Sequence, residues 1–381
     1  MKQLISIALL LTSIQLSAQI KADGYIGVMP VGYYLDLQDL KMWENVVHNR
    51  LNFSYDFSPS VLGVIQFRNR YISGETVRDI VGYSGLIEKD DGFLDMSFNL
   101  TSGSSSVMNV AVDRLWLDFY IGKLQVRAGR QRINWGQAMV WNPNDIFNAY
   151  SYFDFDYPER PGIDGIRLQF FTGVASQLDG VVKIDHERQK TWAARYRFNA
   201  GSYDWQFIGG RLNDREWVTG MGWSGQIGDA AFYGENTLLF PDDGEQTLIA
   251  AMGFNYTFKN SLLIQAEGLY SSNLSGKAES LTEFIGRQAS LFSSQSSIRQ
   301  LSFAKYSLFA SVEYPFTPLL SGSFAAMAFP PTRAFYVGPS FEYSIKSNVY
   351  LSAFINMFVD GSDKITDIAA FQGAVRLKWF F

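Results

Sequence analysis

Residues that support nucleophilic or acid–base catalysis are scarce in this chain. Its 381 residues include two histidines, His48 and His186, and no cysteine. Ser54 shares the face of an extended strand with His48, but no third group orients the pair as such catalysis requires. His186 is flanked only by the acids Asp185 and Glu187. We therefore expect no enzyme activity, no cofactor and no metal site.

Charged side chains are divided between the two halves of the chain. On the polar faces of alternating strands, arginines dominate the first half and glutamates the second, which would form two arcs around one lumen. A field across a pore favours polar or zwitterionic solutes over apolar ones. The alternative is that a plug of the chain's own loops neutralises both arcs. The predicted pore-lining basic residues are Arg50, Arg68, Arg70, Arg114, Arg127, Arg130, Arg132, Arg167, Arg195 and Arg197, and the acidic ones are Glu235, Glu267, Glu313 and Glu342.

Strands must position these residues, because the dominant period of the sequence is two. Residues 47–57 place Leu51 and Phe53 on one face and Arg50 and Asn52 on the other. The chain is 16% aromatic, while its mean hydropathy is near zero, as expected when half of each strand faces lipid. After residue 18 no apolar run approaches the roughly 20 residues of a membrane-spanning helix. A membrane-spanning fold would therefore be a closed barrel.

About eighteen candidate strands follow from this alternation. Short turns fall after even-numbered strands, and the long segments 75–106, 136–162 and 274–302 fall after odd-numbered ones, which predicts an antiparallel up-and-down barrel with both termini on the periplasmic side. Sixteen strands are the alternative, because the strand at 178–187 is the weakest. The candidates are 23–36, 43–57, 61–74, 107–121, 123–135, 163–175, 178–187, 190–200, 203–212, 215–227, 230–241, 245–258, 261–273, 303–315, 318–329, 333–346, 348–360 and 367–380.

The first residues have the pattern of an export signal. Lys2 precedes an apolar run at 4–11, and Leu16-Ser17-Ala18 offers a small-residue cleavage site. We expect residues 1–18 to be a signal peptide and residues 19–381 to form one barrel domain, since no linker divides them. The net charge of −5 argues against nucleic acid as a partner.

The final strand alternates as far as the end of the chain. Leu377, Trp379 and Phe381 share one face, and Arg376 and Lys378 share the other. This resembles the terminal assembly signal of outer-membrane barrels, in which alternate hydrophobic residues precede a final aromatic. The resemblance implies that the barrel-assembly machinery recognises Trp379 and Phe381, and that outer-membrane lipid surrounds the folded chain.

The long segment 136–162, the third outer loop by the parity of the strands, contains a second resemblance. The strand end Gly129-Arg130-Gln131, followed by Trp135-Gly136, leads into Asn142-Pro143 and then Arg160-Pro161-Gly162. The block from Arg127 to Arg167 resembles a broad group of porin-like barrels in Gram-negative bacteria, including uncharacterised members from Bacteroidota. The resemblance implies a porin-type architecture and transfers no catalytic residue.

In general porins the third outer loop folds into the barrel as a constriction, and the aromatic content of this segment favours the same position. Its aromatic residues would offer a slide for sugar faces, and its acids would face the arginines across an eyelet. Alternatively, the acids neutralise the arginines and pin the loop to the wall. Asp154, Asp156 and Asp164 also suggest calcium, but no regular spacing supports it. The predicted constriction residues are Trp135, Trp141, Asp145, Asp154, Asp156 and Glu159.

The sequence therefore predicts an outer-membrane channel for passive diffusion of small polar solutes, narrowest at Arg130, Arg132 and the loop acids. A plugged structural or assembly barrel is the alternative. It would be a partner in an envelope secretion or uptake complex, because the segments 75–106 and 274–302 are long enough to reach another protein. The sequence leaves open whether the barrel is a monomer or a homo-oligomer.

Overall fold

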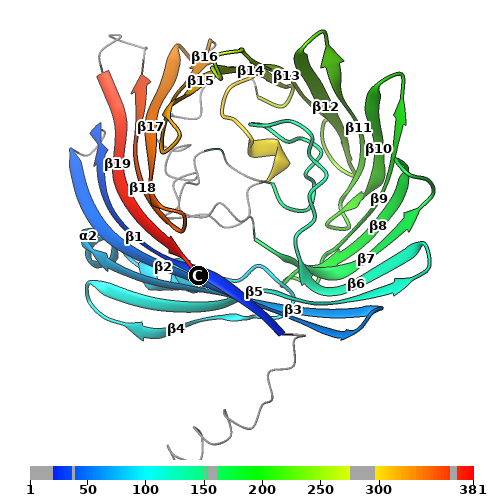
Figure 1. Cartoon of the computed structure of the whole chain (residues 1–381), viewed down its shortest axis with the longest axis horizontal. Helices are drawn as coiled ribbons and strands as arrows, with labels where there is room; N and C mark the ends of the chain where they lie inside the picture. The colour runs from blue at the N-terminus through cyan, green and yellow to red at the C-terminus, as the bar shows by residue number, and fades with distance from the viewer. Residues whose placement is uncertain are drawn as a thin grey trace, which may run out of the picture.

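A closed antiparallel β-barrel is formed by eighteen strands within residues 20–36, 39–149, 152, 161–274, 297–330, 332–360 and 367–381, which the computed structural model describes (Figure 1). β1 pairs with both β2 and β19, so the ring has no free edge. The predicted count of eighteen is confirmed, including the strand considered weakest. The wall strands are β1 (Ile20–Leu35), β2 (Leu40–Ser58), β3 (Val61–Gly74), β5 (Ser106–Ile121), β6 (Leu124–Gln131), β7 (Ile163–Phe171), β8 (Gln177–Ile184), β9 (Lys190–Ala200), β10 (Tyr203–Leu212), β11 (Glu216–Ile227), β12 (Ala230–Pro241), β13 (Thr247–Thr257), β14 (Leu263–Ser271), β15 (Tyr306–Thr317), β16 (Leu320–Phe329), β17 (Ala334–Lys346), β18 (Val349–Asp360) and β19 (Asp367–Phe380).

The wall separates an apolar outer face from a polar inner face. On β5, Leu115 and Leu117 are 42% and 41% exposed, whereas Arg114 and Asp118 on the opposite face are 4% and 0% exposed. This alternation confirms which face of β5 turns outward. Among the described residues, no helix is long and apolar enough to cross a membrane.

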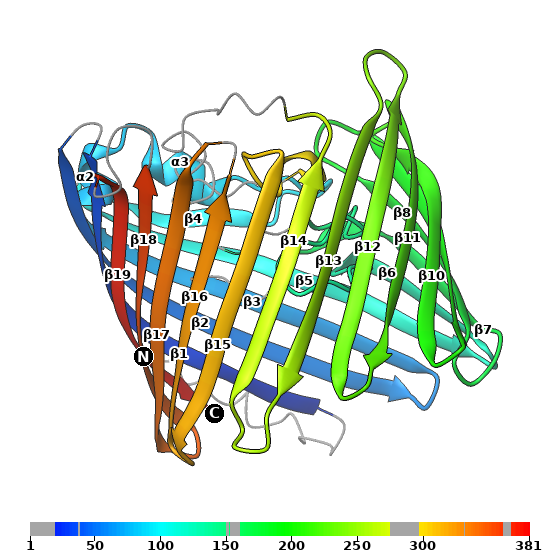
Figure 2. The ribbon, with the colours of Figure 1, turned by 90° about the horizontal axis from the view of Figure 1, so that it is seen from above.

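The two rims of the barrel differ in the length of their connections. Short turns such as 59–60 and 122–123 form one rim, here called the turn end, and the long connections form the other, the loop end. Figure 2 shows this contrast from the side. Gly24 of β1 and Phe381 exchange two backbone hydrogen bonds of 3.0 Å near the turn end. Both ends of the barrel domain therefore lie at the rim with the short turns, as predicted from the order of short and long connections. The predicted signal peptide, residues 1–18, lies outside the described residues.

A nineteenth strand, β4 (Ser97–Ser102), takes a place in the wall where β6 ends early. After Gln131 the chain turns into the lumen, so β6 is shorter than predicted. β4 pairs with β5 on the side that β6 vacates, and Gly92 forms a bridge to Asp185 beyond β8. The segment 90–102, predicted as part of an outer loop, therefore closes a notch in the barrel wall.

Arg130 lies in this notch, which corrects its predicted position in the lumen. It pairs with Leu115 across β5 and β6, and directly paired residues leave an antiparallel sheet on the same side, here the outer face. Its guanidinium donates to both carboxylate oxygens of Asp164 at 2.7 and 2.8 Å and to Asp90 at 2.6 Å. The side chain is only 6% exposed. Arg130 therefore fastens the segment 90–102 to the wall.

Replacing Arg130 by glutamine should lower the free energy of unfolding by about 3–5 kcal/mol, because Asp90 and Asp164 would remain buried without their cation. The reversal potential under a salt gradient should stay at its wild-type value, because the side chain faces outward. Arg78→Gln is the matched control, since its pair with Asp79 is exposed and solvent screens the attraction. A changed reversal potential in Arg130→Gln would contradict the outward placement.

Three segments from the loop end fill part of the barrel interior. The helices α2 (Glu75–Asp79) and α3 (Tyr83–Glu88) pack Tyr83 and Ile87 against the inner faces of β1 to β3. Residues 132–149 lie against the inner faces of β8 to β14, and residues 297–305, with the short helix η2 (Ile298–Gln300), lie against β13 to β18. Figure 1 shows the last two segments inside the ring. The apolar core is therefore inside the lumen.

β1 approaches the backbone of β2 closely at Gly24. A Cβ atom on this residue would overlap the carbonyl oxygen of Arg50, whereas a Cβ on Gly32 of the same strand would meet nothing within 4 Å. We expect Gly24→Ala to lower the free energy of unfolding by about 1–3 kcal/mol through overpacking, and Gly32→Ala to stay near the wild type. Urea unfolding followed by heat-modifiable gel mobility measures both. Equal stability of the two variants would argue against this close approach.

Candidate solute pathway

On β9 and β17, lumen-facing side chains are accessible at the turn end and buried at the loop end. On β9, Thr191 and Arg195 are buried, whereas Arg197 and Asn199 are exposed. On β17 the same change occurs along the strand, from the buried Tyr336 to the exposed Glu342. The candidate pathway is therefore a polar vestibule that begins at the turn end and meets the inward segments at mid-barrel.

The inward segment 132–149 is held by two carboxylates of the barrel wall. Glu267 on β14 accepts backbone N–H groups of Met139, Val140 and Trp141 at 2.7 to 3.3 Å, and the hydroxyl of Tyr233 at 3.1 Å. A carboxylate that accepts several N–H groups makes strong, charge-assisted hydrogen bonds. This contact fixes the course of the segment across the lumen.

Glu235 on β12 forms the second attachment. It accepts the backbone N–H groups of Gln137 at 2.6 Å and of Asn144 at 3.3 Å. The Asn144 side chain also bonds the hydroxyl of Thr237 at 2.8 Å. Glu235 and Glu267 are 0% and 3% exposed, so the prediction that they line an open pore is corrected: they anchor the loop.

The predicted constriction residues that the structure describes are buried within this segment. Trp135 and Asp145 are 0% exposed, and Trp141 is 3% exposed. The indole N–H of Trp135 donates to Asp179 at 3.1 Å, and the ring of Trp141 packs edge-on against Phe309. The third loop folds inward as predicted, but these two indoles form no exposed slide for sugars. Asp154, Asp156, Tyr157 and Glu159 lie outside the described residues.

Five arginines of the basic arc are paired with aspartates. Asp118 receives a bidentate pair from Arg127, with both N···O distances at 2.7 Å, and the Arg127 guanidinium lies 4.7 Å from the ring of Trp116. Asp113 lies 2.7 Å from Arg50 and 3.0 Å from Arg114. The pairing restrains the guanidinium groups and lowers the net charge of the arc.

Asp179 is the most heavily engaged of these acids. Arg167 donates to its two oxygens at 2.9 and 2.5 Å, and Arg195 donates at 3.1 Å. Trp135 donates to the same carboxylate, so Asp179 joins the wall, the basic arc and the inward segment. Among the other predicted basic residues, Arg70 is buried and donates to the Ile87 carbonyl at 3.1 Å. Arg68 and Arg132 are half-buried, and Arg197 is exposed in the vestibule.

Sequence reasoning missed the aspartate partners, although one signal was present. Asp118 alternates with Arg114 on one face of β5 and so lies on the lumen side. Asp113 is the extra residue of a β-bulge, because Gln66 and Phe67 pair with Arg114 and Val112. The bulge allows Asp113 and Arg114, although adjacent in sequence, to form a buried ion pair.

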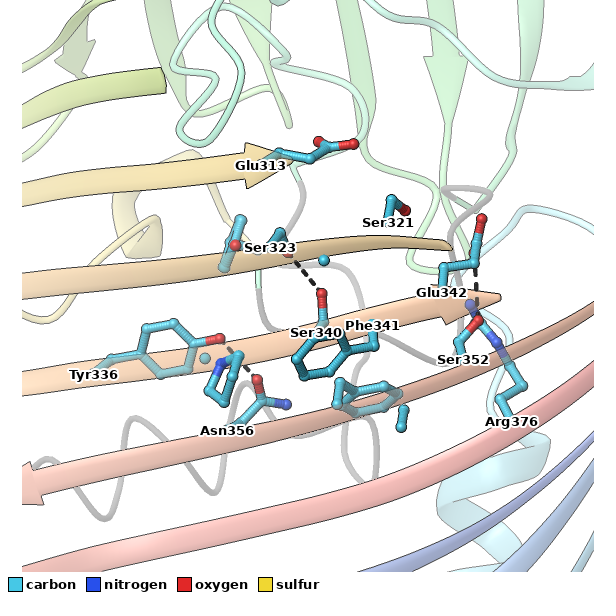
Figure 3. A pocket seen from close by; sticks show the side chains of 16 residues that line it. Glu313, Ser321, Ser323, Tyr336, Ser340, Phe341, Glu342, Ser352, Asn356 and Arg376 are labelled. Carbon is cyan, nitrogen blue, oxygen red and sulfur yellow. Dashed lines mark hydrogen bonds between the residues drawn. The ribbon is translucent and has the colours of Figure 1, made fainter. Parts of the chain in front are cut away.

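The opposite wall, from β15 to β19, holds the accessible acids Glu313 and Glu342. A cavity of about 320 Å³ lies here, with both carboxylates and Arg376 among its lining residues (Figure 3). Tyr152 of the third outer loop also lines it, and burial raises the pKa of this phenol to about 12. The phenol therefore stays neutral and retains its O–H donor at physiological pH.

Neither histidine is among the lining residues of this cavity. His48 is buried on β2 with its ring 5.4 Å from that of Tyr25, and His186 lies on a loop 3.9 Å from Asp91. Asp164, considered for calcium, is paired with Arg130. Within the described part of the chain, no group of three or more acids or histidines is placed to hold a metal ion.

Comparison with known proteins identifies the fold. No family model and no curated protein matches the sequence. Among solved structures, Pseudomonas aeruginosa OccK5 (OpdH) is similar over 95% of this chain and 98% of its own, at 9% identity and a TM-score of 0.59. Acinetobacter baumannii OccAB4 matches over 97% and 100%, at 9% identity and 0.59. The outer membrane protein OprD from Pseudomonas aeruginosa matches over 95% and 93%, at 8% identity and 0.55. The chain therefore has the barrel fold of these proteins over nearly its whole length.

Proposed function

We propose that this chain is a channel of the Gram-negative outer membrane through which small polar solutes diffuse passively. The observation that carries this proposal is the accessible polar vestibule, with arginines on one wall and Glu313 and Glu342 on the other. Opposite charges across a lumen favour polar solutes over apolar ones. The fold similarity to the outer membrane protein OprD supports the location.

The outer apolar face and the chain end support the same location. Leu377, Trp379 and Phe381 are about half exposed on the outer face of the wall, at 46%, 47% and 50%. Aromatic residues at the rim of a barrel are typical of a membrane interface. We propose that this strand is also the signal read by the assembly machinery, and that residues 1–18 are removed on export. The similarity of the block 127–167 to porin-like barrels from Bacteroidota supports an origin in that group.

Liposome swelling tests the channel proposal. Vesicles that contain the refolded protein should swell quickly in isotonic glycine and keep their size in an isotonic solution of a large dextran. Protein-free vesicles and vesicles with heat-denatured protein are the controls. Swelling no faster than in protein-free vesicles, from a protein with the gel mobility of a folded barrel, would contradict the proposal.

A plugged structural barrel is the second candidate, and the filled loop-end half of the lumen favours it. In that case Glu235 and Glu267 would hold a permanent plug, and the long loop-end segments would bind another envelope protein. The same vesicles separate the two functions: a plugged barrel gives no swelling, and affinity purification from membranes should then recover a stoichiometric partner.

A further inference from the structure

The cavity between β15 and β19 is lined mainly by hydroxyl and amide groups. Four serines on β16, β17 and β18 contribute hydroxyls to it, and Tyr336 and Asn356 add a phenol and an amide. Figure 3 shows these side chains around one space together with Glu313, Glu342 and Arg376. The serines are Ser321, Ser323, Ser340 and Ser352.

The polar groups of this cavity are ordered by hydrogen bonds among themselves. Ser323 and Ser340 are 2.7 Å apart, Ser352 donates to Glu342 at 3.3 Å, and Tyr336 donates to Asn356 at 2.7 Å. A serine hydroxyl has one donor and two acceptor sites, so each pair retains capacity for a ligand. Preordered groups lose less entropy on binding than mobile ones.

The charges of the cavity oppose one another. Glu313 is exposed and makes no hydrogen bond or ion pair with any described residue, and Glu342 accepts from Ser352. Arg376 also lines the cavity and lies on β19, next to the strand β18 that carries Ser352. A cation is attracted by the two carboxylates and repelled by the guanidinium. An anion is attracted by the guanidinium and repelled by the two carboxylates. A neutral ligand with many hydroxyl groups can donate to the carboxylates and accept from the guanidinium without leaving an uncompensated charge.

We infer that this cavity is a binding subsite for a neutral polyhydroxylated solute of about monosaccharide size. Its volume of about 320 Å³ is at the lower end of the range of ligand cavities, which fits one small molecule. Phe354, which lies among the lining residues, adds an apolar surface for the C–H face of a sugar ring. The inference rests on the proposed channel function and adds to it a solute class.

Binding measured at equilibrium tests the subsite independently of conduction. Saturation-transfer NMR on the detergent-solubilised protein should be recorded with D-glucose, protonated glucosamine and gluconate, which differ mainly in charge. We expect glucose to bind more tightly than either charged analogue. Ser323→Ala combined with Ser340→Ala should weaken glucose binding about tenfold, which corresponds to about 1.4 kcal/mol. Ser224→Ala, on the inner face of β11 in another part of the wall, is the matched control and should leave binding unchanged.

The outcomes separate the subsite from the channel. Ionic current without glucose binding would overturn the subsite and leave the channel standing. Glucose binding that the double serine variant weakens would support the subsite, even in a protein that carries no current. Tighter binding of glucosamine would overturn the neutral class in favour of cations held by Glu313 and Glu342. Equal losses in the double variant and in Ser224→Ala would overturn the assignment to this cavity.

Discussion

Asp179→Ala should lower the free energy of unfolding by about 3–5 kcal/mol, because it leaves two nearly buried guanidinium groups without their carboxylate. The Asp179 side chain is fully buried, and those of Arg167 and Arg195 are 13% and 8% exposed. The indole N–H of Trp135 also loses its acceptor, which weakens the attachment of the inward segment. Removing one negative charge should further shift the reversal potential toward anion selectivity.

Urea unfolding of the purified barrel measures the first effect, and the zero-current potential under a salt gradient measures the second. Asp204→Ala is the matched control, because Asp204 faces the lumen on β10 but is exposed and accepts one bond from Asn199 at 3.1 Å. Asp179→Asn should fall between the wild type and the alanine variant, since an amide oxygen still accepts hydrogen bonds. Equal stability of Asp179→Ala and Asp204→Ala would refute the central role of Asp179.

Glu267→Ala should release the inward segment and raise single-channel conductance. The substitution removes the common acceptor of three backbone N–H groups, and each buried unsatisfied donor costs about 1–3 kcal/mol. The segment can recover these bonds only by moving into the vestibule, where water reaches it. The lumen should then widen at mid-barrel, and the free energy of unfolding should fall by at least about 3 kcal/mol.

Planar-bilayer recordings of Glu267→Ala compare directly with those of Glu187→Ala. Glu187 is an exposed residue near the loop end, so its removal changes the net charge equally without touching the inward segment. Glu267→Gln should show a smaller increase in conductance, because its amide oxygen accepts at least one of the three N–H groups. If Glu267→Ala conducts like the wild type, the carboxylate does not hold the constriction.

Period-two alternation was sufficient to predict the barrel wall. Each strand buries one face and exposes the other, so Leu115 and Arg114 reveal the orientation of β5 without any knowledge of its neighbours. Turn residues then fixed the strand count. The same rule, applied strictly, places Arg130 outside the lumen, since Arg127 and Arg130 are an odd number of residues apart. Grouping the two by charge alone produced the error.

Contacts across the lumen were beyond sequence reasoning. The alternation predicts that Glu267 points inward. It does not predict that the backbone N–H groups of residues 139–141, more than a hundred positions away in the sequence, donate to its carboxylate. The burial of Trp135 and Trp141 depends on the same docking, which reverses the expectation of exposed aromatic rings. The replacement of β6 by β4 in the wall depends on Arg130 holding Asp90. Such long-range pairings are set by the closed geometry of the barrel and not by local pattern.

Single-channel recording of the wild-type protein in a planar bilayer tests the account most directly. A purified barrel with the gel mobility of the folded state should insert and produce uniform current steps, because polar side chains line the vestibule as far as the inward segment. Those steps should become larger in Glu267→Ala. A folded protein that inserts but carries no current, in the wild type and in Glu267→Ala alike, would contradict a solute pathway through this lumen.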